Sequence, residues 1–221
     1  EMCIRDSLEA LRMVTAGRIG TPVLGRAQLS CWYPPIDGAW RQDPARGGGG
    51  SLMDMGSHCI DLLELYFGRT RRVRCVTDRL VHDYPSEDTA IVTLEFETGA
   101  KGVVDVLFNV PDASSRNRLE LYGSRGSILA EGTIGQGEAG EMVAHLEEGD
   151  GGYDAQQSRD TSGGIRIAPD PVNIYRAEVE AFAQAVLDDT DPPVGGEAGL
   201  WNQRVVAAAY ESAETGGAVP L

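Results

Sequence analysis

Paired cysteines, positive charge and long apolar runs are all scarce in this sequence. Its four cysteines, Cys3, Cys31, Cys59 and Cys75, are scattered singly, and no C-x-x-C motif occurs among them. The chain also shows no secretory signal at its start, a feature that would have favoured disulfide bonds. We therefore interpret the cysteines as reduced thiols and expect a cytoplasmic protein.

The shortage of positive charge bears on the partners of the protein. Lysine and arginine together number 19 against 34 aspartates and glutamates, which gives a formal net charge of -15. Nucleic-acid binding needs clustered basic residues that release counterions from phosphates, so we expect no nucleic-acid partner. The acidic excess would repel anionic lipid, and no apolar run approaches the roughly 20 residues of a transmembrane helix, so we expect no membrane partner.

The composition that remains is enough for a folded core. Of the 221 residues, 42% are hydrophobic, and a chain of this length forms one large domain or two small ones. Residues 1–7 show neither a capping signal nor helical periodicity before the helix-like residues 8–16 begin. We expect residues 1–7 to be a non-native leader and residues 8–221 to be the domain.

Alternating polar and apolar residues predict a series of strands. The expected strands are residues 23–32, 71–82, 88–98, 100–110, 117–123, 127–132 and 141–148. Those from residue 71 onward predict an antiparallel meander of about six strands, with a hairpin at Thr98 and Gly99.

Helical periodicity returns near the C-terminus. One helix is expected from about residue 173, with Tyr175 and Val179 on its apolar stripe, and a second is expected over residues 197–215. Before them, residues 149–171 are rich in Gly, Asp, Ser and Gln, which predicts a mobile surface excursion or a lid.

The stretch around which the chain is organised is residues 47–68, where four glycines lead directly into an apolar, helix-like segment. Asp54, His58 and Asp61 lie at i, i+4 and i+7, so a helix places them in one row on one face. Ser51 suits the N-cap, and Asp54 suits the first turn. A buried polar row needs partners or a purpose. Asp54 as a cap with His58 as a core histidine is one interpretation, and a catalytic row is the other.

A metal site is a third interpretation of the same three side chains, although Cys59 points to a different side of the helix. Neither His82 nor His145 lies in a ligand motif, so no second ligand cluster accompanies the row and we expect no metal.

Two glycine-rich motifs resemble nucleotide-binding loops without their context. Gly135, Gly137 and Gly140 spell G-x-G-x-x-G, but a strand pattern follows them where a dinucleotide fold needs a helix. The four glycines before Ser51 lack the Lys-Ser/Thr pair of a P-loop. We therefore expect a strand connection at the first motif and no phosphate cradle at the second.

Several segments, taken in order, resemble the C-terminal half of the Gfo/Idh/MocA oxidoreductases. They are WRQDP, GGGGSLMDMGSHCIDLLELYFG, EDTAIVTLEFETGAKG, LELYGSRGSI, YRAEVEAFAQAV and VVAAAYESAETGGAVPL. The resemblance implies an α+β fold, an open, mostly antiparallel sheet with helices packed on one face, like the C-terminal domain of dihydrodipicolinate reductase. It also implies that a nucleotide-binding Rossmann lobe, with its glycine-rich turn and Glu-Lys-Pro tripeptide, is missing from this chain.

The resemblance implies roles for particular residues. Asp54 and His58 match the family's Asp-x-x-x-His pair, so His58 is the expected proton acceptor and Asp54 the residue that orients the substrate hydroxyl and stabilises the imidazolium. Trp40, Arg41 and Tyr33 are expected to contact substrate, and Arg41 also the nicotinamide end of NAD or NADP, which the missing lobe mainly binds.

The function that the resemblance implies is the substrate-binding half of an NAD(P)-dependent dehydrogenase that oxidises a hydroxyl of a sugar, polyol or related compound. Such a fragment would be inactive alone. The open face of the sheet is expected to join subunits into a homodimer or homotetramer. A non-catalytic oligomerisation module of the same fold is the alternative.

Overall fold

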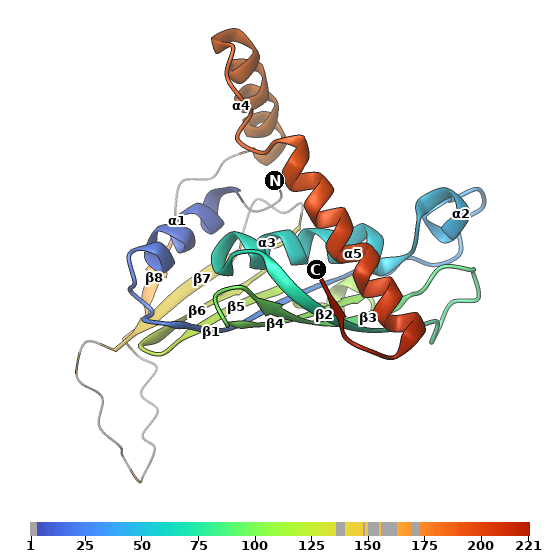
Figure 1. The fold of residues 1–221 in the computed structure, drawn as a ribbon, viewed down its shortest axis with the longest axis horizontal. Coiled ribbons are helices and arrows are strands. Elements are labelled where there is room, and N and C mark those ends of the chain that lie inside the picture. The colour runs from blue at the N-terminus through green and yellow to red at the C-terminus, as the bar shows by residue number, and fades with distance from the viewer. Residues whose placement is uncertain (1–3, 136–139, 148, 150–154, 156–162, 169–172) are drawn as a thin grey trace.

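A nine-stranded sheet runs the length of the molecule, with helices over one of its faces (Figure 1). The computed structural model describes residues 4–135, 140–147, 149, 155, 163–168 and 173–221. The strands are β1 (Pro22–Ser30), β2 (Thr70–Asp78), β3 (Thr89–Phe96), β4 (Lys101–Leu107), β5 (Arg118–Gly123), β6 (Gly126–Glu131), β7 (Glu141–Leu146), β8 (Ile165–Ile167) and β9 (Val219–Pro220). This confirms the predicted open α+β fold.

The order of the strands corrects the predicted meander. The sheet runs β8-β7-β6-β5-β1-β4-β3-β2-β9, so β1 lies between β4 and β5. It pairs parallel to β4, with Ala27 opposite Val104, and antiparallel to β5, with Ala27 opposite Leu119. Every strand expected from the sequence forms. The insertion of β1 was not predictable, because alternation reveals a strand but not its distant partner.

Two short strands were not expected. β8 lies within residues 149–171, where a surface excursion was predicted, and pairs with β7. The rest of that predicted excursion lies mostly outside the described residues. β9 pairs with β2 at the other edge of the sheet. With three and two residues respectively, neither strand is long enough to show a periodic pattern.

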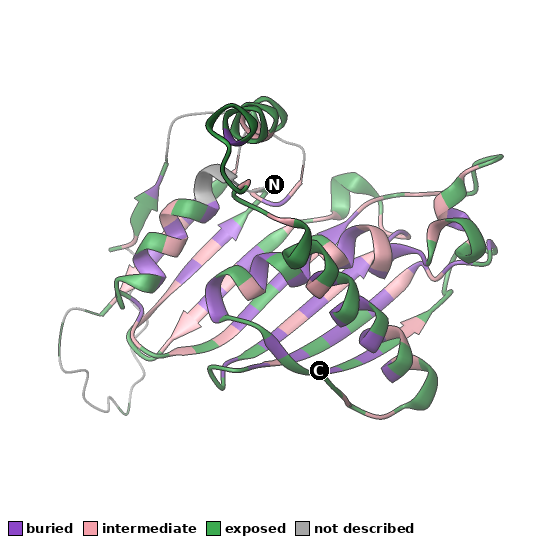
Figure 2. Ribbon diagram, turned by 45° about the horizontal axis from the view of Figure 1, so that its top comes forward, coloured by how far each residue is buried: buried purple, intermediate pink, exposed green. Residues whose placement is uncertain are grey.

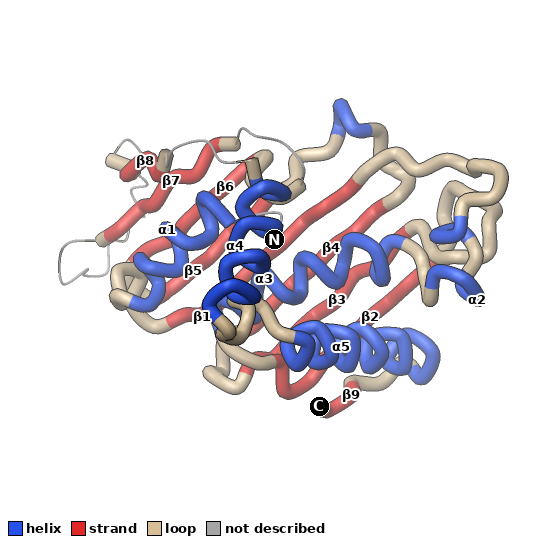
Figure 3. The backbone as a smooth tube through the Cα atoms, turned by 90° about the horizontal axis from the view of Figure 1, so that it is seen from above, coloured by secondary structure: helices blue, strands red, loops and turns tan. Residues whose placement is uncertain are grey.

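Three of the helices cover one face of the sheet (Figure 3). The helices are α1 (Ile4–Thr15), α2 (Pro44–Gly47), α3 (Ser57–Phe67), α4 (Ile174–Asp188) and α5 (Gly196–Thr215), and of these α1, α3 and α5 lie on the sheet. α1 begins four residues before the predicted start, inside the expected leader. That residues 1–7 are a non-native leader stays a prediction.

The core lies between α3, α5 and the central strands. Ala90, Val92, Leu94 and Phe96 of β3 are buried, as their alternation predicts, and α3 packs Leu63 and Phe67 against the sheet. At Gly25 of β1 a Cβ atom would collide with the side chains of Phe67 and Leu63, so the strand needs glycine for the helix to approach this closely.

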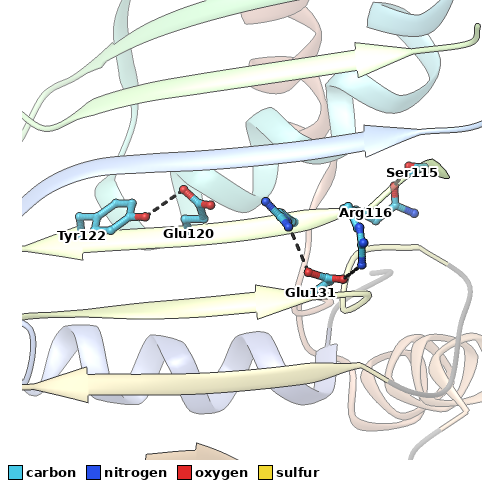
Figure 4. Close-up of polar contacts among 7 residues, drawn as sticks. Ser115, Arg116, Glu120, Tyr122 and Glu131 are labelled. Carbon is cyan, nitrogen blue, oxygen red and sulfur yellow. Dashed lines mark hydrogen bonds and ion pairs between the residues drawn. The ribbon is translucent and has the colours of Figure 1, made fainter. Parts of the chain in front are cut away.

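The opposite face of the sheet has no helix over it among the described residues (Figure 2). Val103, Asp105 and Leu107 of β4 are half-buried there, while Val104 and Val106 point to the core. Charged groups on this face pair with one another, as in Figure 4, where Glu131 contacts Arg116 and Arg118. The face is therefore a mixture of half-buried apolar side chains and ion pairs.

α4 stands away from the rest of the molecule (Figure 1). The predicted helix forms, and Asn173 caps it by accepting the N–H of Arg176 at 2.9 Å. Its apolar stripe, however, is exposed, including Val179 and Phe182 at 67% and 60%. Among the described residues, no helix has both the length and the apolar character needed to cross a membrane.

Candidate active site

The glycine run is a close-packed segment. A Cβ atom on Gly49 would overlap the hydroxyl of Tyr210 in α5, and one on Gly50 would overlap the carbonyl oxygen of Glu87. Because any side chain would push these elements apart, the run needs glycine for space. The glycines do not form a phosphate cradle here. They bring the start of the following helix against α5 and against the segment before β3.

The helix that follows begins with a π-helical turn, Leu52–Gly56, before α3 continues to Phe67. Turns of this kind are rare and often occur at functional sites. The predicted cap is wrong, because Ser51 already has helical backbone angles and makes no side-chain capping bond. Its hydroxyl oxygen is buried and has no hydrogen-bond partner among the described residues. Glu87 takes the place of the cap by accepting N–H groups of the first turn.

Asp54 binds Arg41. The guanidinium Nε donates to Oδ1 of Asp54 at 2.7 Å, and this bond is the main cause that raises the pKa of Arg41. Asp54 lies in the first turn, as expected, and has a further partner in Arg41. The two side chains are 38% and 32% exposed, and pairs this open contribute only about 0–1 kcal/mol to stability. Stability alone does not explain why the pair is placed here.

Trp40 and Tyr33 complete the surroundings of the pair. The guanidinium carbon of Arg41 lies 4.3 Å from the ring centre of Trp40, and the neighbouring Tyr33 side chain also acts to raise the pKa of Arg41. The ring of Tyr33 packs 4.9 Å from that of Phe108. The structure thus brings four of the five predicted site residues together.

His58 is the fifth and lies one turn along from Asp54. It is exposed, and it makes no hydrogen bond or ion pair within the described ranges. The interpretation of His58 as a satisfied core histidine is therefore wrong. Asp61 is exposed as well, further along the same helix. An imidazole that is open to solvent is free to meet a ligand.

Sequence reasoning missed Cys31, which follows β1. Burial raises the pKa of its thiol to about 11, and the negative charges of Asp112 and Asp54 act in the same direction. The thiol therefore stays protonated beside the Arg41–Asp54 pair and is not a ready nucleophile. A lone cysteine at the end of a strand gives no signal of this position in the sequence.

Sequence reasoning also missed Ser86 and Glu87, which precede β3. The hydroxyl of Ser86 donates to the carbonyl oxygen of Arg41 at 2.9 Å, so this segment holds both the arginine and the helix start. In the sequence, Glu87 and the two residues after it begin a strand pattern, and that pattern gives no indication of contacts with Arg41 or with the helix start.

The G-x-G-x-x-G motif falls between two antiparallel strands. β6 and β7 are antiparallel neighbours, and Gly135 and Gly140 lie in their connection, as expected from the strand pattern; residues 136–139 of that motif lie outside the described residues. Within the described residues, no three His, Cys, Asp or Glu side chains gather as metal ligands would.

A cleft of about 760 Å³ lies behind the glycine run, lined by residues that include Met53, Asp78, Glu87, Tyr210 and Glu214. Neither His58 nor the Arg41–Asp54 pair lines it. The predicted site is instead an open surface on the side of the sheet that carries the helices.

Comparison with known proteins identifies the family. Residues 7–129 match the domain described as the GFO/IDH/MocA C-terminal domain. The chain belongs to this family. The match runs from within α1 to within β6 and takes in the glycine run, the π-helical turn and α3, so it includes every candidate site residue.

Two curated relatives of this Gfo/Idh/MocA chain have names that refer to sugars or sugar derivatives. D-xylose 1-dehydrogenase (NADP(+)) 2 of Haloferax volcanii is 31% identical over 208 residues, which are 94% of this chain and 59% of the relative. The 1,5-anhydro-D-fructose reductase of Ensifer adhaerens is 24% identical over 94% of this chain and 58% of its own length. The chain therefore spans about three fifths of each of these relatives.

Solved structures show the same fold. The aldose-aldose oxidoreductase of Caulobacter crescentus, complexed with glycerol, superposes with a TM-score of 0.83 at 23% identity, over all of this chain and 62% of its own. A levoglucosan dehydrogenase in complex with NADH and levoglucosan superposes with a TM-score of 0.79 at 18% identity, over 97% of this chain and 63% of its own.

Proposed function

We propose that this chain is the substrate-binding half of an NAD(P)-dependent oxidoreductase that oxidises a hydroxyl group of a sugar, polyol or related compound. The observation that carries the proposal is His58, which is exposed one turn from the Arg41–Asp54 pair on the side of the sheet that carries the helices. Relatives named for xylose, anhydrofructose and inositol support the substrate class.

In this proposal His58 accepts the proton of the substrate hydroxyl, since an imidazole can take a proton near neutral pH. Asp54 orients that hydroxyl and favours the imidazolium, and Arg41 holds the Asp54 carboxylate in place through the 2.7 Å bond. A bound nicotinamide would supply the chemistry of hydride acceptance at the same carbon. Tyr33 and Trp40 would border the substrate.

The residues of this chain fit only one end of such a cofactor. Arg41, stacked on Trp40 and partly exposed, is suited to a polar group such as a carboxamide. Within the described residues, no glycine-rich turn joins a parallel strand to a helix, which is what the pyrophosphate needs. The remainder of the cofactor would therefore bind to a further lobe, of the kind that accounts for the extra length of the relatives.

The exposed stripe of α4 supports the existence of such a lobe. Val179 and Phe182 are more than half exposed, and apolar groups gathered in this way mark surfaces that another body covers. α4 rises on the side of the sheet that carries the helices (Figure 1), among them α3, which contains His58. A lobe in that space would cover the stripe and close the site.

A titration tests this division of labour. The isolated chain should bind neither NAD nor NADP tightly and should not turn over sugars. Submicromolar binding of either nucleotide, measured by calorimetry, would contradict the proposal.

The open face of the sheet is the proposed contact between subunits, in a homodimer or homotetramer. Ile91 and Val76 are exposed there and Leu107 is half-buried, so pairing two faces would bury apolar surface. A monomer in sedimentation experiments at micromolar concentration would contradict it.

The proposed location is the cytoplasm.

The alternative function, a module that only assembles subunits, predicts a different result for the site. If His58 is the base, His58→Ala should lower turnover about a hundredfold or more in an enzyme that includes the cofactor-binding lobe. Unchanged turnover would favour the assembly module.

A further inference from the structure

The start of the helix that carries Asp54 and His58 is held by one distant residue. Oε2 of Glu87 accepts the N–H of Gly50 at 2.8 Å, and Oε1 accepts the N–H of Leu52 at 2.9 Å. The carbonyl oxygen of Glu87 accepts the N–H of Ser51 at 3.1 Å. Three consecutive N–H groups, which a helix start leaves without internal partners, therefore all bind to Glu87.

Tyr210 fixes the carboxylate from the opposite side. Its hydroxyl donates to Oε1 of Glu87 at 2.9 Å from within α5, and the glycine at position 49 leaves room for this approach. Burial and the negative charge of Glu87 raise the pKa of Tyr210, so the hydroxyl remains a donor over the working range of pH. The helix start is thereby linked to α5.

The neighbours of Glu87 anchor it to the sheet. Asp88 is fully buried and accepts the N–H groups of Leu80, Val81 and His82 at 2.9 Å each. Ser86 holds the carbonyl oxygen of Arg41. Residues 86–88 thus connect three parts: the sheet, the arginine and the helix start.

We propose that Glu87 is a positioning residue, which sets the place of Asp54 and His58 by holding the π-helical turn before them, with Tyr210 fixing its carboxylate. A carboxylate is needed because an amide side chain cannot accept both N–H groups and the tyrosine hydroxyl. The inference rests on the proposed function only for its effect on turnover. The placing of the π-helical turn by Glu87, which is the geometric part of the proposal, concerns this chain alone.

Amide hydrogen exchange of this chain tests the geometric part. In Glu87→Gln, the amides of Gly50 and Leu52 should exchange at least tenfold faster, while the amides of β3 and β4 keep their rates. Tyr210→Phe, which removes a single hydrogen bond, should give a smaller increase at Leu52. Unchanged rates at Gly50 and Leu52 would overturn the proposal, and so would equal acceleration in the sheet.

Glu64→Gln is the matched control. Glu64 is also a half-buried carboxylate that accepts a backbone N–H, from Thr70 at 2.7 Å, and an aromatic donor of α5, Trp201 at 3.0 Å. It lies at the other end of α3. Both bonds end on Oε1 of Glu64, and an amide keeps one such oxygen, so this variant should leave exchange at Thr70, Gly50 and Leu52 near the wild-type rates. Acceleration at Gly50 and Leu52 would overturn the assignment to Glu87.

Kinetics in an enzyme that includes the cofactor-binding lobe test the effect on chemistry. Glu87→Gln should lower kcat about tenfold and leave KM within about twofold, because the base is displaced while the substrate contacts persist. If His58→Ala abolishes turnover but Glu87→Gln leaves kcat unchanged, the positioning role is overturned. If His58→Ala has no effect, the proposed function itself fails, whatever the exchange data show.

Discussion

Single residues fix the geometry of this site mostly through contacts with the backbone. Asp88 shows the principle, since one buried carboxylate receives three backbone N–H groups and also bonds to Thr89 and Asn109. Burial acts to raise the pKa of Asp88, but the hydrogen bonds from the backbone outweigh it and the pKa is lowered. The folded state therefore stabilises the ionised form of Asp88 relative to the protonated form.

Asp88 should make stability depend on acidity. A carboxyl group whose pKa is lowered by folding contributes stability above its unfolded pKa of about 3.9, and this contribution is lost as the pH falls through the folded pKa. Asp88→Asn should lower the free energy of unfolding by about 1–3 kcal/mol at pH 7 and flatten the acid side of the profile. Denaturant unfolding between pH 3 and pH 7 measures both; a variant with the wild-type profile would contradict the assignment.

Individual site residues were predictable from the sequence only in part. The placing of Asp54, His58 and Arg41 followed from spacing and family resemblance, and the structure brings Arg41 to Asp54. The roles of Glu87 and Tyr210 were not predictable, because their mutual contact joins positions 123 residues apart and Glu87 lies 37 and 35 residues from Gly50 and Leu52. Local patterns report periodicity and caps, whereas contacts of this kind depend on how the elements pack.

At the scale of elements, the glycine run and the π-helical turn behave as one unit. The space that a side chain at Gly50 would need is occupied by the carbonyl oxygen of Glu87. The strands were predictable from alternation, and the position of β1 between β4 and β5 was not. Sequence patterns thus identified the strands themselves more reliably than the strands that pair with them.

Substitution of Gly50 should therefore be costly for the whole unit. Gly50→Ala forces a Cβ atom into Glu87 and should destabilise the chain by about 3 kcal/mol, as overpacking does. The matched control is Gly199→Ala in α5, where nothing lies within 4 Å of the added atom and a gain of up to about 1 kcal/mol is expected. Chemical denaturation compares the two. A similar effect of both substitutions would contradict the close packing.

At the scale of the whole molecule, two surfaces expose apolar side chains. These are the open face of the sheet and the stripe of α4. The chain belongs to the Gfo/Idh/MocA family and spans about three fifths of the length of these two curated relatives. The exposure of α4 was not predictable from its sequence, since an amphipathic pattern predicts an apolar face but not what covers it.

Charged substitutions on the α4 stripe should affect the stability of the isolated chain and of the two-lobe enzyme differently. Val179→Asp with Phe182→Asp should change the free energy of unfolding of the isolated chain by no more than about 0.5 kcal/mol, because both side chains are exposed. In an enzyme that includes the second lobe, the same pair should weaken the docking and lower the melting temperature. Ala181→Asp, at another exposed position of α4, is the control. Equal melting temperatures for all joined forms would show that the lobe does not cover the stripe.

The most direct test of the central claim is rescue of His58→Ala by added imidazole, in an enzyme that contains both lobes. The space that the missing His58 side chain leaves can hold a small base taken up from solution with the substrate. If His58 accepts the hydroxyl proton, the variant should lose about a hundredfold or more in turnover and regain part of it as imidazole is added, while the wild type is unaffected. Full turnover without imidazole would contradict the account.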